Sequence, residues 1–123
     1  MITGEVSANR EASIRFVVRG PDGNGLEIEL VIDTGFNGWI SLPSSLISDL
    51  GLPWHRRGRG ELADGSEIIF DIYEAKIIWD GQSRRVWVDE IDSAPLIGMS
   101  LLDGYELLIQ VWSGGNVTIA ARK

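Results

Sequence analysis

The sequence predicts an all-β domain, and two features carry this prediction. Apolar side chains alternate with polar ones along several segments, as where Ile14, Phe16 and Val18 alternate with Arg15 and Arg19. A period of two is the pattern of a strand that buries one face. Turn residues lie between such segments, since Asp-Gly pairs favour the positive φ angles of tight hairpins. These pairs occur at 22–23, 64–65, 80–81 and 103–104.

The alternating segments predict the strands in chain order. The second of them is the most regular, because Leu26, Ile28, Leu30 and Ile32 are separated mainly by glutamates. Near the C-terminus a Gly-Gly-Asn turn separates two further segments, which therefore form another hairpin. Strands are expected at 14–18, 26–32, 86–88, 107–111 and 117–119.

Other segments depart from the alternation. Residues 44–50 predict a short helix, with a serine available as N-cap and Gly51 as the C-terminal stop. Residues 99–102 predict a second one. The basic, glycine-containing segment Trp54–Gly60 is expected to be a mobile, solvated loop.

Tryptophans add candidates for the core and for the site. Trp79 and Trp87 lie in strand segments and are expected in the core, whereas Trp39 is a candidate for the wall of a cleft.

Composition limits the classes of protein to consider. The 123 residues suit one domain spanning 1–123, and the absence of cysteine excludes disulfides and thiolate metal sites. With a single histidine and no recognisable ligand pattern, we expect no metal and no cofactor. The net charge of −7 argues against nucleic acid and anionic membranes as partners. Without a signal-peptide pattern or an apolar span, the expected location is the cytoplasm.

One carboxylate stands in an unusual place. An apolar segment, Leu30–Ile32, runs directly into Asp33, Thr34 and Gly35. A carboxylate at the end of a buried strand costs free energy unless it has partners or a function. The glycine lets the backbone approach a neighbouring group closely, and the threonine hydroxyl can hold a backbone group. Because this tripeptide occurs by chance in roughly a few per cent of chains of this length, it does not identify a site alone.

The surrounding sequence resembles the retropepsin-like aspartic proteases of clan AA, in particular their bacterial and cellular single-domain members. Glu29–Pro43 is similar to the active-site strand and loop of that family, and Ala94–Leu102 is similar to its second signature. Between them, Gly60–Tyr73 occupies the position of the flap, with Ala63–Ser66 at its tip. The resemblance extends from about residue 14 to 119. It implies a closed β-barrel with a flap hairpin and one or two short helices.

The resemblance also implies roles for individual residues. Asp33 would be the catalytic carboxylate, Thr34 would bond across a twofold axis, and Gly35 would direct its amide at the carboxylate. Ile97 would pack behind the loop and line a subsite. The residues expected to bind substrate are Phe36, Ala63, Asp64, Gly65 and Ile97.

The chemistry of this family requires two carboxylates that share one proton. The chain has one Asp-Thr-Gly, so the pair must come from two copies of Asp33 in a homodimer. The implied activity is that of an aspartic endopeptidase, a hydrolase acting on polypeptides.

Two alternatives remain open. Many family members have alanine or serine where this chain has Phe36, which leaves open a non-catalytic peptide-binding or dimerisation module with the same fold. The other alternative is an unrelated β-barrel in which the tripeptide is accidental.

Overall fold

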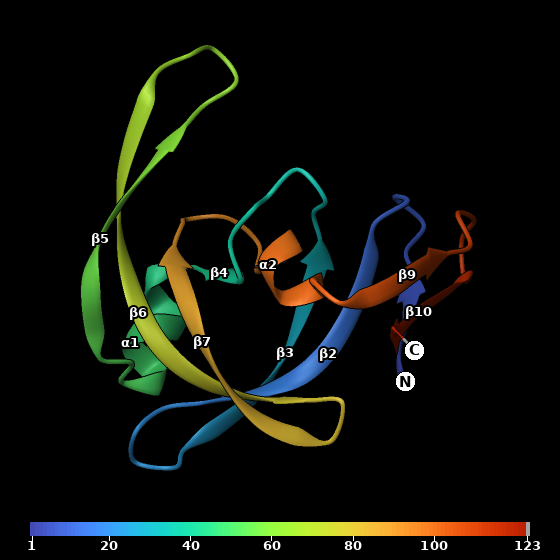
Figure 1. The fold of residues 1–123 in the computed structure, drawn as a ribbon, viewed down its shortest axis with the longest axis horizontal. Helices are drawn as coiled ribbons and strands as arrows, with labels where there is room; N and C mark the ends of the chain where they lie inside the picture. The colour runs from blue at the N-terminus through green and yellow to red at the C-terminus, as the bar shows by residue number, and fades with distance from the viewer. Residues whose placement is uncertain (123) are drawn as a thin grey trace.

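The computed structural model describes residues 1–122, and over this range the chain is all-β with two short helices, as expected (Figure 1). Both helices fall where the sequence predicts them. The elements in chain order are β1 (Ile2–Val6), β2 (Ala12–Arg19), β3 (Gly25–Ile32), β4 (Ile40–Leu42), α1 (Ser44–Leu50), β5 (Trp54–Glu61), β6 (Glu67–Trp79), β7 (Gln82–Glu90), β8 (Leu96–Ile97), α2 (Met99–Leu102), β9 (Tyr105–Ile109) and β10 (Asn116–Ala121).

Six of the strands described in residues 1–122 close into a barrel, in the order β6, β7, β4, β8, β3 and β2. Closure occurs where β2 returns to β6, pairing Val18 with Ile77 and Arg19 with Lys76. Two of the pairings, β3 with β8 and β4 with β7, are parallel. The closed barrel predicted from the sequence is therefore confirmed.

The sheet continues beyond the barrel at both ends. On one side β5 pairs with the first half of β6, forming a long hairpin that arches away from the barrel at the left of Figure 1. On the other side β1, β10 and β9 follow β2 in that order. The loop between β3 and β4 opens at the same end of the barrel as the hairpin.

The barrel interior holds the core. Alternation along each strand directs one set of side chains inward, and several of these have no exposed surface. Trp79 is buried as predicted, with 3% of its surface exposed. Trp87 is different, because it lies on the outside and stacks on His55 with 4.1 Å between ring centroids. The side chains with no exposed surface include Val18, Leu30, Ile40, Leu42, Ile77, Val88, Ile97 and Leu101.

The helix α1 differs from the prediction at its start. Its N-cap is Pro43, with extended backbone and no side-chain cap hydrogen bond. The Ser44 hydroxyl instead donates to Asp92 Oδ1 at 3.2 Å, across to the segment that follows β7. The end of the helix is as predicted, since Gly51 adopts a left-handed φ of 61°.

The segment expected to be a mobile basic loop is strand β5, so that prediction is wrong. Seven residue pairs join β5 to β6 from Trp54 to Glu61, with one shift of register between Trp54 and Arg56. A Cβ atom on Gly58 would lie 2.7 Å from Ile72 and 2.8 Å from Phe70. The glycine that indicated a loop therefore allows close packing on the neighbouring strand.

The barrel closure generates a stability prediction. Replacing Ile77, which has no exposed surface, by alanine will lower the free energy of unfolding by about 2–5 kcal/mol through lost burial and an unfilled cavity. Ile69 lies on the same strand with 62% of its surface exposed, so Ile69→Ala is the matched control and will change stability by less than about 0.5 kcal/mol. Urea unfolding of both variants measures the difference, and equal losses would contradict the assigned core.

Candidate active site

Asp33 lies immediately beyond the end of β3, at the mouth of the barrel. Its backbone N–H donates to the carbonyl of Ile97 at 2.9 Å, which extends the parallel pairing of β3 and β8 by one residue. Its carbonyl accepts the N–H of Phe36 at 3.1 Å and so closes a turn. The Asp33 side chain is half-buried, whereas Thr34 and Gly35 are exposed. The tripeptide is thus fixed at its base and open to solvent at its tip.

Within this turn, the N–H of Gly35 donates to Oδ1 of Asp33 at 2.9 Å. A Cβ atom at residue 35 would lie 3.3 Å from the same oxygen, so glycine gives the carboxylate room. The hydrogen bond fixes the orientation of the carboxylate. This is the contact that the resemblance implied for Gly35.

The loop that follows is held by the start of α2. The N–H groups of Gly98, Met99 and Ser100 donate to carbonyls of the loop, and the Ser100 hydroxyl donates to the carbonyl of Asn37 at 2.6 Å. These donors would otherwise lack partners at a helix N-terminus. The backbone acceptors are Trp39, Phe36 and Gly38, at 2.9, 2.8 and 3.1 Å respectively.

Phe36 occupies a space that two glycines leave open. A Cβ atom on Gly38 would lie 2.5 Å from Cζ of the Phe36 ring, and one on Gly98 would lie 2.8 Å from its Cδ2. Side chains at either position would therefore displace the ring. The phenylalanine that departs from the common pattern is accommodated by its own loop and by the start of α2.

The predicted flap is a hairpin with its turn at Ala63–Ser66. Gly65 has φ +86°, and the Asp64 carboxylate accepts hydrogen bonds from the hydroxyl and backbone N–H of Ser66. The hydroxyl bond is the main reason that the pKa of Asp64 lies below its usual value. Ala63, Asp64 and Gly65 are exposed, and Figure 1 shows the turn standing away from the loop between β3 and β4. The single chain therefore does not bring these residues together with Asp33.

Ile97 and its neighbour Leu96 face opposite ways. Ile97 has no exposed surface and packs in the core, where it pairs with Ile32 and Ile40. Leu96 is half-buried on the other face of the sheet. Ile97 thus supports the Asp33 loop from behind, and Leu96 is the member of this pair with surface available for a ligand.

Asp89 is a site residue that the sequence analysis missed. A Cβ atom on Gly38 would lie 3.0 Å from Asp89 Oδ2, so this carboxylate lies against the same loop as Asp33 and Phe36. Burial raises the pKa of Asp89 from 3.8 to about 6, although the charge of Arg56 lowers it. The alternation of Val86 and Val88 indicates only that Asp89 points outward. Its contact with the loop depends on the parallel pairing of β4 and β7, which no local pattern reveals.

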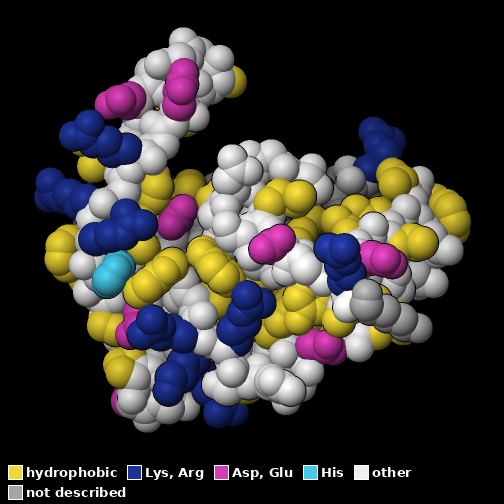
Figure 2. Space-filling model, viewed as in Figure 1, with side chains coloured by type: hydrophobic (Ala, Val, Ile, Leu, Met, Phe, Trp, Pro, Cys, Tyr) yellow, Lys and Arg dark blue, Asp and Glu magenta, His cyan; other side chains and the backbone are white. Residues whose placement is uncertain are grey.

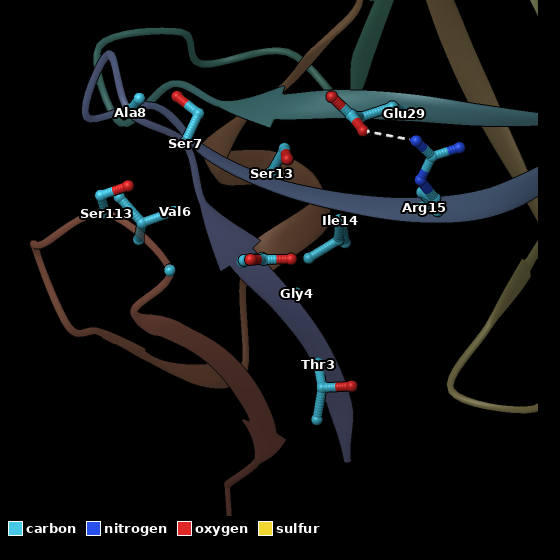
Figure 3. Close-up of a pocket in the computed structure, with 12 residues that line it drawn as sticks. Thr3, Gly4, Val6, Ser7, Ala8, Ser13, Ile14, Arg15, Glu29 and Ser113 are labelled. Atoms are coloured by element: carbon cyan, nitrogen blue, oxygen red, sulfur yellow. Dashed lines mark hydrogen bonds and ion pairs between the residues drawn. The ribbon is translucent and has the colours of Figure 1, made fainter.

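Two of the cavities among the described residues do not include Asp33. One of about 540 Å³ lies between β1, β2 and the turn before β10, and the Arg15–Glu29 ion pair of 2.9 Å lies beside it (Figure 3). It contains none of the predicted site residues. The other, of about 590 Å³, borders α2 and includes Trp39, whose ring lies 4.9 Å from the Arg84 guanidinium. Trp39 therefore faces the α2 side of the loop.

Over residues 1–122, no group of three or more His, Asp or Glu side chains is arranged to hold a metal ion. In the same range, no helix has the length and apolar character needed to span a membrane.

Asp89 generates a prediction for stability against pH. Because its pKa is raised in the folded chain, the unfolded chain loses this proton first as the pH rises, and stability falls between pH 3.8 and about 6. Asp89→Asn removes this loss. After allowance for screening by solvent, the variant will be more stable than the parent by about 1 kcal/mol near pH 7.5 and equal to it below about pH 4.

Urea unfolding at the two pH values measures this difference. Asp49→Asn, at an exposed carboxylate on α1, is the control and will show no such change with pH. A stability gain of Asp89→Asn that is the same at both pH values would contradict the prediction.

The fold is similar to that of known proteases. A retropepsin-like aspartic protease from Rickettsia conorii matches with a TM-score of 0.60 at 14% identity, over 99% of this chain and 91% of that one. EIAV protease, in complex with the inhibitor HBY-793, matches with a TM-score of 0.50 at 20% identity, over 79% of this chain and 91% of that one. No protein-family model and no curated protein sequence matches the chain. The structural likeness shows that this chain has the retropepsin-like fold.

Proposed function

We propose that the chain is an aspartic endopeptidase that acts as a homodimer, with one Asp33 from each chain. The observation that carries the proposal is the Asp33 loop, in which the Gly35 N–H holds the carboxylate at 2.9 Å at the open end of a retropepsin-like barrel. A fold alone does not establish an activity, so the proposal depends on this loop.

The reaction is the hydrolysis of a peptide bond by water. Two carboxylates held close together cannot both ionise, so the pair shares one proton. The ionised Asp33 takes a proton from a water molecule, whose oxygen bonds to the peptide carbonyl carbon. The protonated Asp33 polarises the carbonyl oxygen. A proton then passes to the amide nitrogen, the C–N bond breaks, and no covalent enzyme intermediate forms.

The other predicted residues position the pair and the substrate. Thr34 is exposed, so its hydroxyl is available to the twofold-related loop. Phe36 and Leu96 are half-buried and contact substrate side chains, with Ile97 buried in the core beneath the loop. Ala63, Asp64 and Gly65 at the hairpin turn close over an extended peptide, which binds by strand-type hydrogen bonds.

The first test concerns the catalytic carboxylate. Asp33→Asn will abolish cleavage of an unfolded polypeptide, with a loss of at least about 10³-fold, because an amide neither shares nor transfers the proton. Cleavage is followed by mass spectrometry across mildly acidic and neutral pH. Asp49→Asn retains the parent rate and shows that the loss belongs to Asp33.

Undiminished cleavage by Asp33→Asn would show that Asp33 is not the catalytic carboxylate. Peptide binding without turnover by the parent chain at every pH would instead favour a non-catalytic binding module.

The second test concerns the shared site. If each site needs Asp33 from both chains, a mixed dimer of parent and Asp33→Asn is inactive. With free exchange in an equimolar mixture, about a quarter of the dimers are parental, so activity falls to about half that of the same amount of parent alone. Light scattering checks dimer formation, and native mass spectrometry with a mass tag on one of the two chains checks exchange. Unchanged activity in the exchanged mixture, or a strict monomer that cleaves, would show that one chain suffices.

A further inference from the structure

One row of side chains crosses the sheet from the hairpin to Asp33. Residues paired across neighbouring strands point to the same face, and side chains along one strand alternate between faces. The row ends at Val31, two residues before Asp33, so the Asp33 side chain belongs to the face that the row follows. The row runs through Arg56, Ile72, Asp89, Ser41, Leu96 and Val31, on β5, β6, β7, β4, β8 and β3 respectively.

Asp89 lies in the middle of this row and has no partner among residues 1–122. It accepts no hydrogen bond there and forms no ion pair within 4.0 Å, although it is half-buried beside Gly38. The next residue in the row, Ser41, is fully buried, and its hydroxyl has no hydrogen-bond partner in the described chain. An unpaired carboxylate in such a place costs free energy. Such a cost is typical of a group whose partner is a ligand.

The surroundings favour a cationic partner. A groove of about 370 Å³ begins at Glu90, the next residue after Asp89, and also contains Asp71 and Asp92. The cation whose charge acts on Asp89 is Arg56 on β5, and Figure 2 shows basic side chains along the outer side of that strand. Asp71 is itself paired with Arg57 at 3.8 Å, and Asp92 accepts hydrogen bonds from Ser44. The negative charge added next to Asp89 is therefore that of Glu90, which favours a cation there.

We propose that Asp89 sets the substrate specificity of this site, by accepting the ammonium or guanidinium group of a lysine or arginine close to the scissile bond. The proposal rests on the proposed function, since it requires a peptide bound next to Asp33, on the face of the sheet to which Asp89 also belongs. An extended peptide directs alternate side chains to one face, so one of them points at Asp89. Ion-paired hydrogen bonds with a carboxylate are the strong kind. In a twofold dimer Asp89 occurs twice, so the preference holds on both sides of the cleaved bond.

The rival role for Asp89 is internal. Arg56 could move with the hairpin and pair with Asp89 when the site closes, in which case the carboxylate serves closure and not selection. The two roles differ in one measurement. If Asp89 selects the substrate, the effect of replacing it depends on the substrate side chain. If Asp89 pairs with Arg56 on closure, replacing either residue affects the cleavage of all substrates to the same extent.

The test uses pairs of peptides that differ at one residue, lysine or arginine against glutamine or norleucine, at each position on both sides of the cleaved bond. The parent chain will cleave the basic peptides with a kcat/KM about tenfold or more above that of the neutral ones at one position on each side. Asp89→Asn will remove this ratio while still cleaving the neutral peptides. Asp49→Asn is the control and keeps the ratio.

Three results would overturn the proposal. The first is a parent chain that cleaves basic and neutral peptides equally, and the second is an Asp89→Asn variant that keeps the preference. The third is an equal loss on all peptides in both Asp89→Asn and Arg56→Ala, which would assign Asp89 to closure.

A binding measurement separates this proposal from the proposed function. In the Asp33→Asn background, fluorescence anisotropy with labelled basic and neutral peptides reports affinity without turnover. Tighter binding of the basic peptide that is lost on adding Asp89→Asn supports the role of Asp89 even if the parent chain cleaves nothing. If the parent chain cleaves peptides but binds the basic and neutral peptides with equal affinity, the proposed protease activity stands and the proposed role of Asp89 in specificity is wrong.

Discussion

Six hydrogen bonds outside the strand ladders join residues 31–39 to residues 95–100, and the site depends on this connection. Asp33 is linked to Ile97, and the loop carbonyls that follow accept the first amides of α2. A polar loop gains the rigidity of the barrel in this way, because the carbonyls of residues 36–39 bond to a segment that is itself anchored in the core. The same contacts satisfy amide donors at the start of α2, so helix end and loop stabilise each other.

The fold was largely predictable because the local sequence pattern suffices to predict most of the strands. Alternation along β2 and β3 and the Asp-Gly turns require no knowledge of distant residues. The short strands were harder, since β4 and β8 have three and two residues and are defined by pairing with each other and with β7 and β3, which are distant in the sequence. β5 was misread because glycines and arginines suggest a loop, while its pairing with β6 decides its conformation.

The candidate site was predictable to the extent that it is contiguous. Asp33, Thr34 and Gly35 form one turn, and the Gly35 contact follows from their order in the chain. Asp89 lies more than fifty residues away and reaches Gly38 through the β4–β7 pairing, which is not local. The space for Phe36 likewise depends on Gly98 from another part of the chain. Nothing near either residue in the sequence indicates these contacts.

The strand β6 is unbroken from the hairpin turn to the barrel seam. Its thirteen residues begin opposite β5 and end opposite β7 and β2. One continuous strand therefore belongs both to the projecting β5–β6 hairpin and to the barrel. Displacement of the hairpin must therefore bend a pair of hydrogen-bonded strands, since β6 has no loop between its hairpin part and its barrel part at which it could hinge. The pairing of β5 with β6 shifts register between Trp54 and Arg56, where the hairpin meets the barrel, and a strand bends at such a shift. The position of the hairpin is thereby coupled to the part of β6 that carries Ile72, the neighbour of Asp89.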